Sequence, residues 1–142
     1  MKPKQSGATI VEFMLVLLLF LMFTFGILDF ARMLFTWNAA NEATRAGARY
    51  AVVCDPTGGE ADVLATMQGV LPDISTISVV WTPPSCDPTT CIGVTVSITG
   101  LNFQWIAPMP GSASKLIPMP QFSTFLTREV MRQDPNSNAI CS

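Results

Sequence analysis

The sequence predicts an α+β fold in which one long N-terminal helix packs on a small antiparallel β-sheet, with one short additional helix. Residues 13–28 form an uncharged apolar run, and no proline interrupts residues 29–51. Two later segments alternate apolar and polar residues, as is typical of strands that are covered on one face. Four cysteines follow the apolar run, which suits a small domain cross-linked in an oxidising compartment.

The composition excludes several classes of function. The chain has 142 residues, enough for one small domain and an anchor, and with 49% hydrophobic and 13% charged residues it is too apolar for disorder. Its net charge is −2 and it has no basic run, so nucleic acid is not an expected partner. It also lacks histidine, the commonest general base and metal ligand. We therefore predict no enzyme activity, no cofactor and no metal site.

The first element, residues 8–28, is long enough to cross a membrane. As a helix it would span about 30 Å, the thickness of the hydrocarbon core. Lys2 and Lys4 precede it, and Asp29 is the first charge after it. The positive-inside rule then places the N-terminus in the cytoplasm and the rest of the chain outside. A signal peptide is the alternative, but the first small-residue cleavage pattern after the run comes only at residues 46–48.

One carboxylate within this span, Glu12, needs a chemical explanation, because an unpaired ionised acid at the edge of hydrocarbon is costly. Cleavage between Gly7 and Ala8 would create an α-amino group one helical turn from Glu12, in its own chain or in a neighbour. We therefore expect a leader at residues 1–7, processing at Gly7 and Ala8, and an assembly role for Glu12. The alternative is that Glu12 merely reaches the lipid headgroups from the first helical turn.

These residues also resemble a known family. Gly7 with Glu12 at the fifth position after the cut is similar to a type IV prepilin processing site. The continuation is similar to the TadE-like minor pilins of the tight-adherence (Tad, or Flp) pilus system. The positions that carry this second resemblance are Gly26, Asp29, Phe30, Arg32 and residues 41–51. The close resemblance covers about residues 6–53.

The resemblance implies a pilin-like fold and a structural role, as a minor pilin or pseudopilin. It implies cleavage by a prepilin peptidase, delivery to an inner-membrane assembly platform, and contact with membrane lipid, the main pilin and a second minor pilin. The protein would be a single-pass protein of a bacterial inner membrane with a periplasmic domain, exposed at the cell surface once built into a pilus. There it would help to initiate, assemble or cap an adhesive pilus.

Two other functions stay open. A main filament pilin is one, although the outer domain is large for that role. A single-pass module that binds carbohydrate or an envelope partner is the other, because its three tryptophans would offer stacking surfaces.

The helix is expected to continue beyond the membrane to about residue 52, with residues 29–53 as its soluble half. A stripe of small residues, Ala40, Ala43, Gly47 and Ala51, follows this half. Small residues at this spacing allow another element to approach closely. We expect the chain's own sheet to pack there, and docking of another pilin helix is the alternative.

The outer domain is expected to occupy residues 54–142. Residues 60–71 have helical spacing and end before a proline. Residues 77–82 and 92–99 alternate as strands, and the turn-rich link between them predicts an antiparallel hairpin. Residues 121–132 fit either a helix or a strand, and we favour a third strand.

A proline-rich stretch at residues 101–120 predicts a long irregular connection. It contains four large apolar residues, Phe103, Trp105, Ile106 and Met109. We expect them to pack on the sheet or the long helix. The alternative is an exposed patch for a partner or for the membrane surface.

The four cysteines allow three disulfide connectivities. The hairpin would bring Cys86 and Cys91 together, which leaves Cys54 at the helix end to pair with Cys141 in the tail. The second bridge would stabilise the domain by about 4–5 kcal/mol, because it closes a loop of nearly the whole domain. A zinc site made by all four cysteines is the alternative, which an oxidising compartment disfavours.

Overall fold

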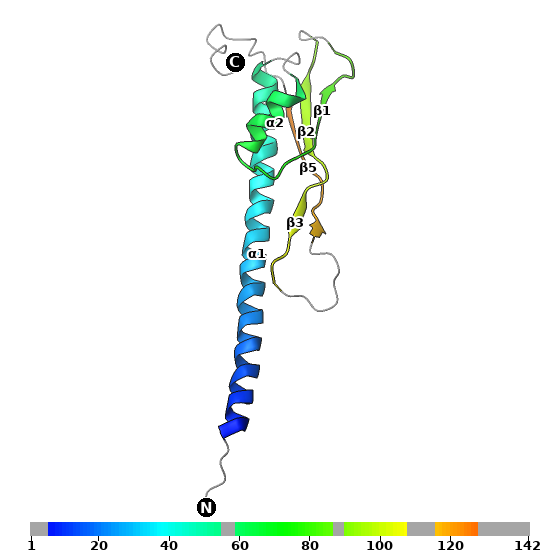
Figure 1. Cartoon of the computed structure of the whole chain (residues 1–142). Coiled ribbons are helices and arrows are strands. Elements are labelled where there is room, and N and C mark those ends of the chain that lie inside the picture. The colour runs from blue at the N-terminus through cyan, green and yellow to red at the C-terminus, as the bar shows by residue number, and fades with distance from the viewer. Residues whose placement is uncertain (1–5, 55–58, 87–89, 108–115, 128–142) are drawn as a thin grey trace, which may run out of the picture.

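The protein is described here by a computed structural model that covers residues 6–54, 59–86, 90–107 and 116–127. Helix α1 (Ser6–Cys54) is a single helix of 49 residues. Figure 1 shows that α1 runs along most of the molecule and that the other elements lie beside its C-terminal half. Together with a short second helix and an antiparallel sheet, it confirms the predicted α+β fold.

Beside α1 lie the short helix and the main sheet. The short helix is α2 (Glu60–Gln68), and the strands are β1 (Ile77–Thr82), β2 (Gly93–Ile98) and β5 (Phe122–Thr127). Their order is β1-β2-β5, and both pairs are antiparallel. The predicted hairpin is therefore β1–β2. The ambiguous segment at residues 121–132 contains strand β5, as we favoured, and its residues 128–132 lie outside the described chain.

The connection between β2 and β5 is more regular than the sequence predicted. Strands β3 (Asn102–Gln104) and β4 (Leu116–Pro118) pair antiparallel as a separate two-stranded sheet. The Met119 N–H donates to the Leu101 carbonyl oxygen at 2.9 Å and extends this pairing. The prediction of an irregular connection was therefore wrong at these residues. A proline is tolerated at Pro118 because it ends an edge strand, where its missing N–H is not required.

The core fills the space between the C-terminal half of α1, α2 and one face of the main sheet. Strand β2 is central, and its residues Val94, Val96 and Ile98 are buried against α1 and α2. Val80 and Phe125 face the other way in β1 and β5, and both are exposed. The alternation of apolar and polar residues that predicted these strands therefore matches the alternation of buried and exposed side chains in the sheet.

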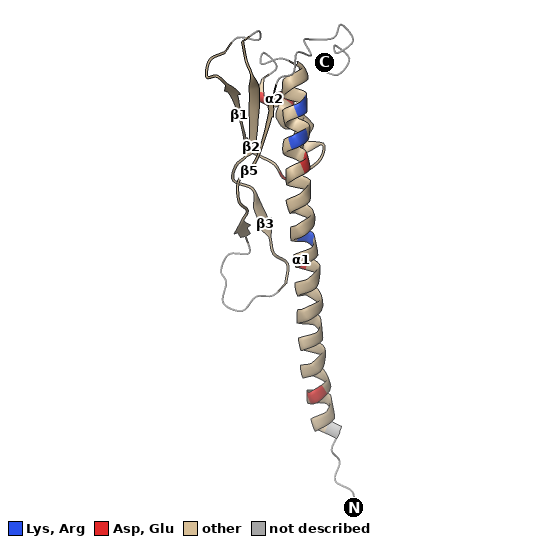
Figure 2. Cartoon of the chain, turned by 180° about the vertical axis from the view of Figure 1, so that it is seen from behind, with Lys and Arg blue, Asp and Glu red and all other residues tan. Residues whose placement is uncertain are grey.

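The N-terminal half of α1 has no such cover. All of its large apolar side chains from Ile10 to Leu28 are exposed. Within the described chain, α1 is the one helix long and apolar enough to cross a membrane. Figure 2 shows one acidic residue near the start of α1, then a long uncharged stretch, and the remaining charges beside the domain.

Candidate functional site

The predicted processing and assembly residues lie at the bare end of α1. Gly7, Ala8 and Glu12 are all helical and exposed. A Cβ atom added at Gly7 would meet nothing within 4 Å. Among the described residues, no ion pair involves Glu12. Ala8 and Glu12 lie one turn apart on an accessible surface, where an enzyme or a second helix could reach both.

A second site lies where the covered half of α1 begins, and sequence reasoning did not find its main contacts. The Asp29 side chain is buried there, with 1% of the residue exposed. Its Oδ2 accepts hydrogen bonds from the backbone N–H groups of Ala107 at 2.6 Å and Ile106 at 3.0 Å. Its Oδ1 accepts one from Nη1 of Arg32 at 3.0 Å. One carboxylate therefore joins the segment after β3 to the helix.

These contacts set the charge of Asp29. Burial alone would raise its pKa, because desolvation penalises the charged form. The hydrogen bonds from Ala107, Ile106 and Arg32 and the charge of Arg32 outweigh that effect and lower the pKa of Asp29 below its usual range. The carboxylate is thus ionised at neutral pH and acts as the acceptor for two backbone amides.

The sequence showed part of this site. The i,i+3 spacing of Asp29 and Arg32 predicts their ion pair. The two amides belong to Ile106 and Ala107, which lie 77 and 78 positions after Asp29 in the sequence. No local sequence pattern predicts a contact over that separation. Arg32 also lies over the Phe103 ring, with its guanidinium carbon 5.4 Å from the ring centroid.

The large apolar residues of the proline-rich stretch are covered only in part. Phe103 is buried, as we expected, whereas 58% of Ile106 is exposed. Trp105 is half-buried and contacts Phe103 edge to face, with ring centroids 6.4 Å apart. Met109 lies outside the described residues. In this stretch, Phe103 therefore belongs to the buried interior and the Ile106 side chain is exposed.

The predicted stripe of small residues lies at the interface between α1 and the domain. Ala40, Ala43, Gly47 and Ala51 are all buried. A Cβ added at Gly47 would stand 2.6 Å from Sδ of Met67, which shows how closely α2 approaches. The chain's own elements occupy this surface, so a second pilin helix would have to displace them to dock there.

Polar and aromatic contacts extend that interface along β5. The hydroxyls of Thr44 and Thr124 are hydrogen-bonded at 2.8 Å. The rings of Trp37 and Phe122 meet edge to face with centroids 5.0 Å apart. Helix α1 and strand β5 are therefore fixed to each other by specific side-chain pairs as well as by apolar burial.

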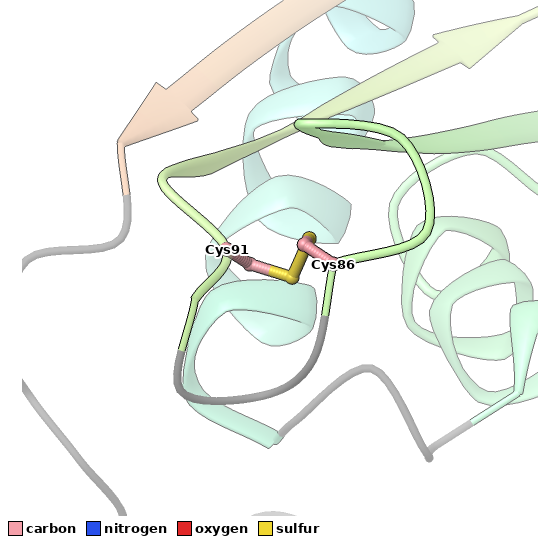
Figure 3. Close-up of a disulfide and its surroundings, with 2 residues drawn as sticks. All are labelled: Cys86 and Cys91. Atoms are coloured by element: carbon pink, nitrogen blue, oxygen red, sulfur yellow. A yellow bond between two sulfur atoms is a disulfide. The ribbon is translucent and has the colours of Figure 1, made fainter.

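The link between β1 and β2 contains a disulfide between Cys86 and Cys91, the pair that the hairpin favoured (Figure 3). Cys54 is also disulfide-bonded. Its predicted partner, Cys141, lies outside the described residues. These three sulfurs are not thiolates, so the zinc alternative is not supported. In the described ranges, no group of three or more candidate ligands could hold a metal ion.

A polar cavity of about 490 Å³ lies beside Arg32. Its polar lining residues include Arg32, Thr36, Asp73, Asn102 and Gln104. Both signs of charge and two amides face this space, so it suits water and polar groups. Phe103 and Leu116 also line the cavity.

The N-terminal part of the chain is similar to a known protein family. Residues 7–49 match the family model of TadE-like proteins. The match begins at the predicted cleavage glycine and includes Glu12, Asp29 and Arg32, and it confirms the resemblance seen in the sequence. No curated protein and no solved structure matches the chain.

Proposed function

We propose that this TadE-like chain is a minor pilin or pseudopilin of a tight-adherence pilus or a related secretion machine. In this proposal a prepilin peptidase removes residues 1–7, and residues 8–28 anchor the protein in the bacterial inner membrane. Residues 29–53 carry the domain of residues 54–142 on the periplasmic side. The mature subunit then acts with the main pilin and a second minor pilin on the inner-membrane assembly platform.

One observation carries the proposal. The family match coincides with a helix whose N-terminal half is not covered by the rest of the described chain and carries a single acidic residue. The match covers residues 7–49, and the exposed apolar side chains run from Ile10 to Leu28. A helix that is hydrophobic on all sides is stable in lipid or among other apolar helices. Glu12 is the exception in that surface and therefore the natural point for a specific contact.

The chemistry of that contact follows from the cleavage. Before it, Ala8 is an amide and offers no charge to Glu12. After it, Ala8 bears an ammonium group one turn from Glu12, close enough to pair within the chain or with a neighbouring subunit. In hydrocarbon such a pair is less costly than the isolated Glu12 carboxylate of the precursor. Processing would thus supply the charged partner that Glu12 needs during assembly.

The mature N-terminus tests the processing step. Mass spectrometry of the protein from pilus-producing cells should find a chain that starts at Ala8. Deletion of the prepilin peptidase, or the substitution Gly7→Leu, should leave the leader attached. A working assembly whose subunit still begins at Met1 would refute the proposed processing.

The assembly step has its own test. Glu12→Gln removes the charge, keeps the shape, and is expected to abolish co-purification with the other pilins while cleavage persists. Glu42→Gln is the matched control, because Glu42 lies on the same helix but pairs on the surface with Arg45. If both variants assemble equally well, Glu12 has no assembly role.

A further inference from the structure

The end of β3 lies at the level on α1 where the proposed membrane span ends. Asp29 is the residue after Leu28, the last apolar residue of that span. Its carboxylate holds the N–H groups of Ile106 and Ala107, the first at 3.0 Å. Side chains of this segment are therefore fixed at the boundary of the hydrocarbon, although they lie far away in sequence.

The exposed residues change character as the chain approaches this boundary. Asn102 and Gln104 are exposed amides on β3, and the residue between them, Phe103, is buried. Two residues further on, the exposed side chain is Ile106 instead of an amide. On the neighbouring strand Leu116, which pairs with Gln104, is 55% exposed. Polar side chains thus give way to apolar ones at the end of the sheet that is nearest to the span.

We propose that Ile106 and Leu116 insert into the headgroup layer of the leaflet on the domain side, so that the β3–β4 sheet forms a second contact with membrane lipid. The inference rests on the proposed span of residues 8–28. Trp105, half-buried beside Ile106, keeps its indole nitrogen buried, so the exposed side chains of Ile106 and Leu116 supply the contact.

Lipid is the occupant that the geometry favours, because Ile106 is held beside Asp29, next to the exposed apolar surface that runs along α1 from Ile10 to Leu28 and continues at Phe30. The headgroup region adds roughly 5–7 Å on each side of the hydrocarbon core. Arg32 lies about 4.5 Å beyond Asp29 along the helix axis. Arg32 lines the polar cavity, and the exposed Leu116 lines it too. Exposed polar and apolar side chains therefore lie together within about one helical turn of Asp29, which suits a headgroup layer, where lipid polar groups and hydrocarbon meet.

A second contact would fix the orientation of the domain. A domain attached through one helix alone can rotate about the helix axis and tilt with it. Anchoring at Ile106 and Leu116 would hold one side of the domain toward the bilayer and keep the far end, at the Cys86–Cys91 link, directed away from it (Figure 1). The subunit would then present a defined face to its partners before assembly.

Methyl NMR of the full-length mature protein can test the contact. The protein, labelled at isoleucine methyl groups, is placed in phosphatidylethanolamine/phosphatidylglycerol nanodiscs that contain a 5-doxyl phospholipid or, separately, a water-soluble gadolinium chelate. Ile27 reports on the span. Ile92 is the matched control, since it is 63% exposed but lies next to Cys91 at the other end of the domain.

We expect the doxyl lipid to broaden the Ile106 methyl several times more than the Ile92 methyl, and the gadolinium chelate to do the reverse. A response of Ile106 equal to that of Ile92 would overturn the inference. Protection of Ile106 from both agents would overturn it too, because a second copy or another protein would then cover this surface. If Ile27 also fails to respond to the doxyl lipid, the proposed span itself is wrong. A response at Ile27 with none at Ile106 refutes the second contact alone.

Discussion

Up to Leu28, α1 carries large apolar side chains on every side, all of them exposed, whereas from Asp29 onward its buried positions are mostly small residues and charged and amide side chains appear among its other positions. Both halves belong to one uninterrupted helix. The first half has the surface of an element surrounded by apolar material, and the second that of an element which receives a sheet at close range. Side-chain size, more than hydrophobicity alone, separates the half that carries the domain from the half that does not.

The strongest test of this comparison places the same substitution in each half. Gly47→Leu puts a side chain where Met67 and Val63 already stand and should destabilise the domain by about 1–3 kcal/mol. Gly26→Leu adds the same side chain where nothing lies within 4 Å and should leave domain stability unchanged. Thermal unfolding followed by near-ultraviolet circular dichroism in detergent measures both. Equal effects would mean that the small residues are not there for packing.

The β1–β2 link, at the end of the domain away from the apolar half of α1, is closed by a disulfide. Removing this disulfide should have the next largest effect. The disulfide Cys86–Cys91 closes a short loop, so the paired substitution to serine should cost about 2 kcal/mol. Denaturant unfolding measures the loss. Amide exchange at Ile106 and Ala107 should not change, because that end is held by Asp29. Faster exchange there would show that the two ends are coupled.

The segment of Ile106 and Ala107, which Asp29 holds against α1, should open locally when Asp29 is replaced. Asp29→Ala removes the acceptor of two amides, and the N–H groups of Ile106 and Ala107 should lose protection from hydrogen exchange. Glu42→Ala is the control, because it breaks an i,i+3 pair with Arg45 that is exposed on both sides. That control should change little, as surface pairs contribute a few tenths of a kcal/mol. Retained protection in Asp29→Ala would show that other contacts hold the segment.

The same junction should depend on pH, with a sign set by the lowered pKa of Asp29. A carboxyl whose pKa is lower in the folded state than in the unfolded state contributes its full stabilisation above the ordinary value, 3.8. The contribution is lost as the pH falls from there through the lowered pKa. Protection of Ile106 and Ala107 should therefore decrease in acid in the native protein, with no matching step in Asp29→Ala.

The smallest expected effect concerns the hydroxyl pair between α1 and β5. Thr44→Val alone should cost about 1 kcal/mol, because it leaves the Thr124 hydroxyl without this partner in a partly buried place. The double variant with Thr124→Val should recover part of that loss. A double-mutant cycle from denaturant unfolding gives the coupling. Additive effects would show that the pair contributes no specific energy.

Much of the fold could be predicted because its signals are local. The apolar run, the alternation in residues 77–82 and 92–99, and the spacing of residues 60–71 each follow from one element's contact with its surroundings. The paired strands β3 and β4 could not be predicted in this way, because each has only three residues. A ladder of that length leaves no periodic pattern, and the prolines nearby favour a loop.

The candidate sites divide in the same manner. Gly7, Ala8 and Glu12 are recognised from spacing within one helix, and so is the ion pair of Asp29 with Arg32. The amides that Asp29 accepts could not be predicted, since they reach it only after the sheet has turned the chain back along α1.

The sequence by itself determined that a long helix, partly apolar on all sides, carries a small disulfide-bonded α+β domain. It did so because helix length, hydrophobic period and cysteine placement are properties of neighbouring residues. Only the tertiary structure decided that the small-residue stripe is covered by α2 and the sheet. It alone also decided that Asp29 marks the base of the domain and that Ile106 is exposed there. Those facts depend on which distant segments meet, and that is fixed by the packing of the whole domain around β2.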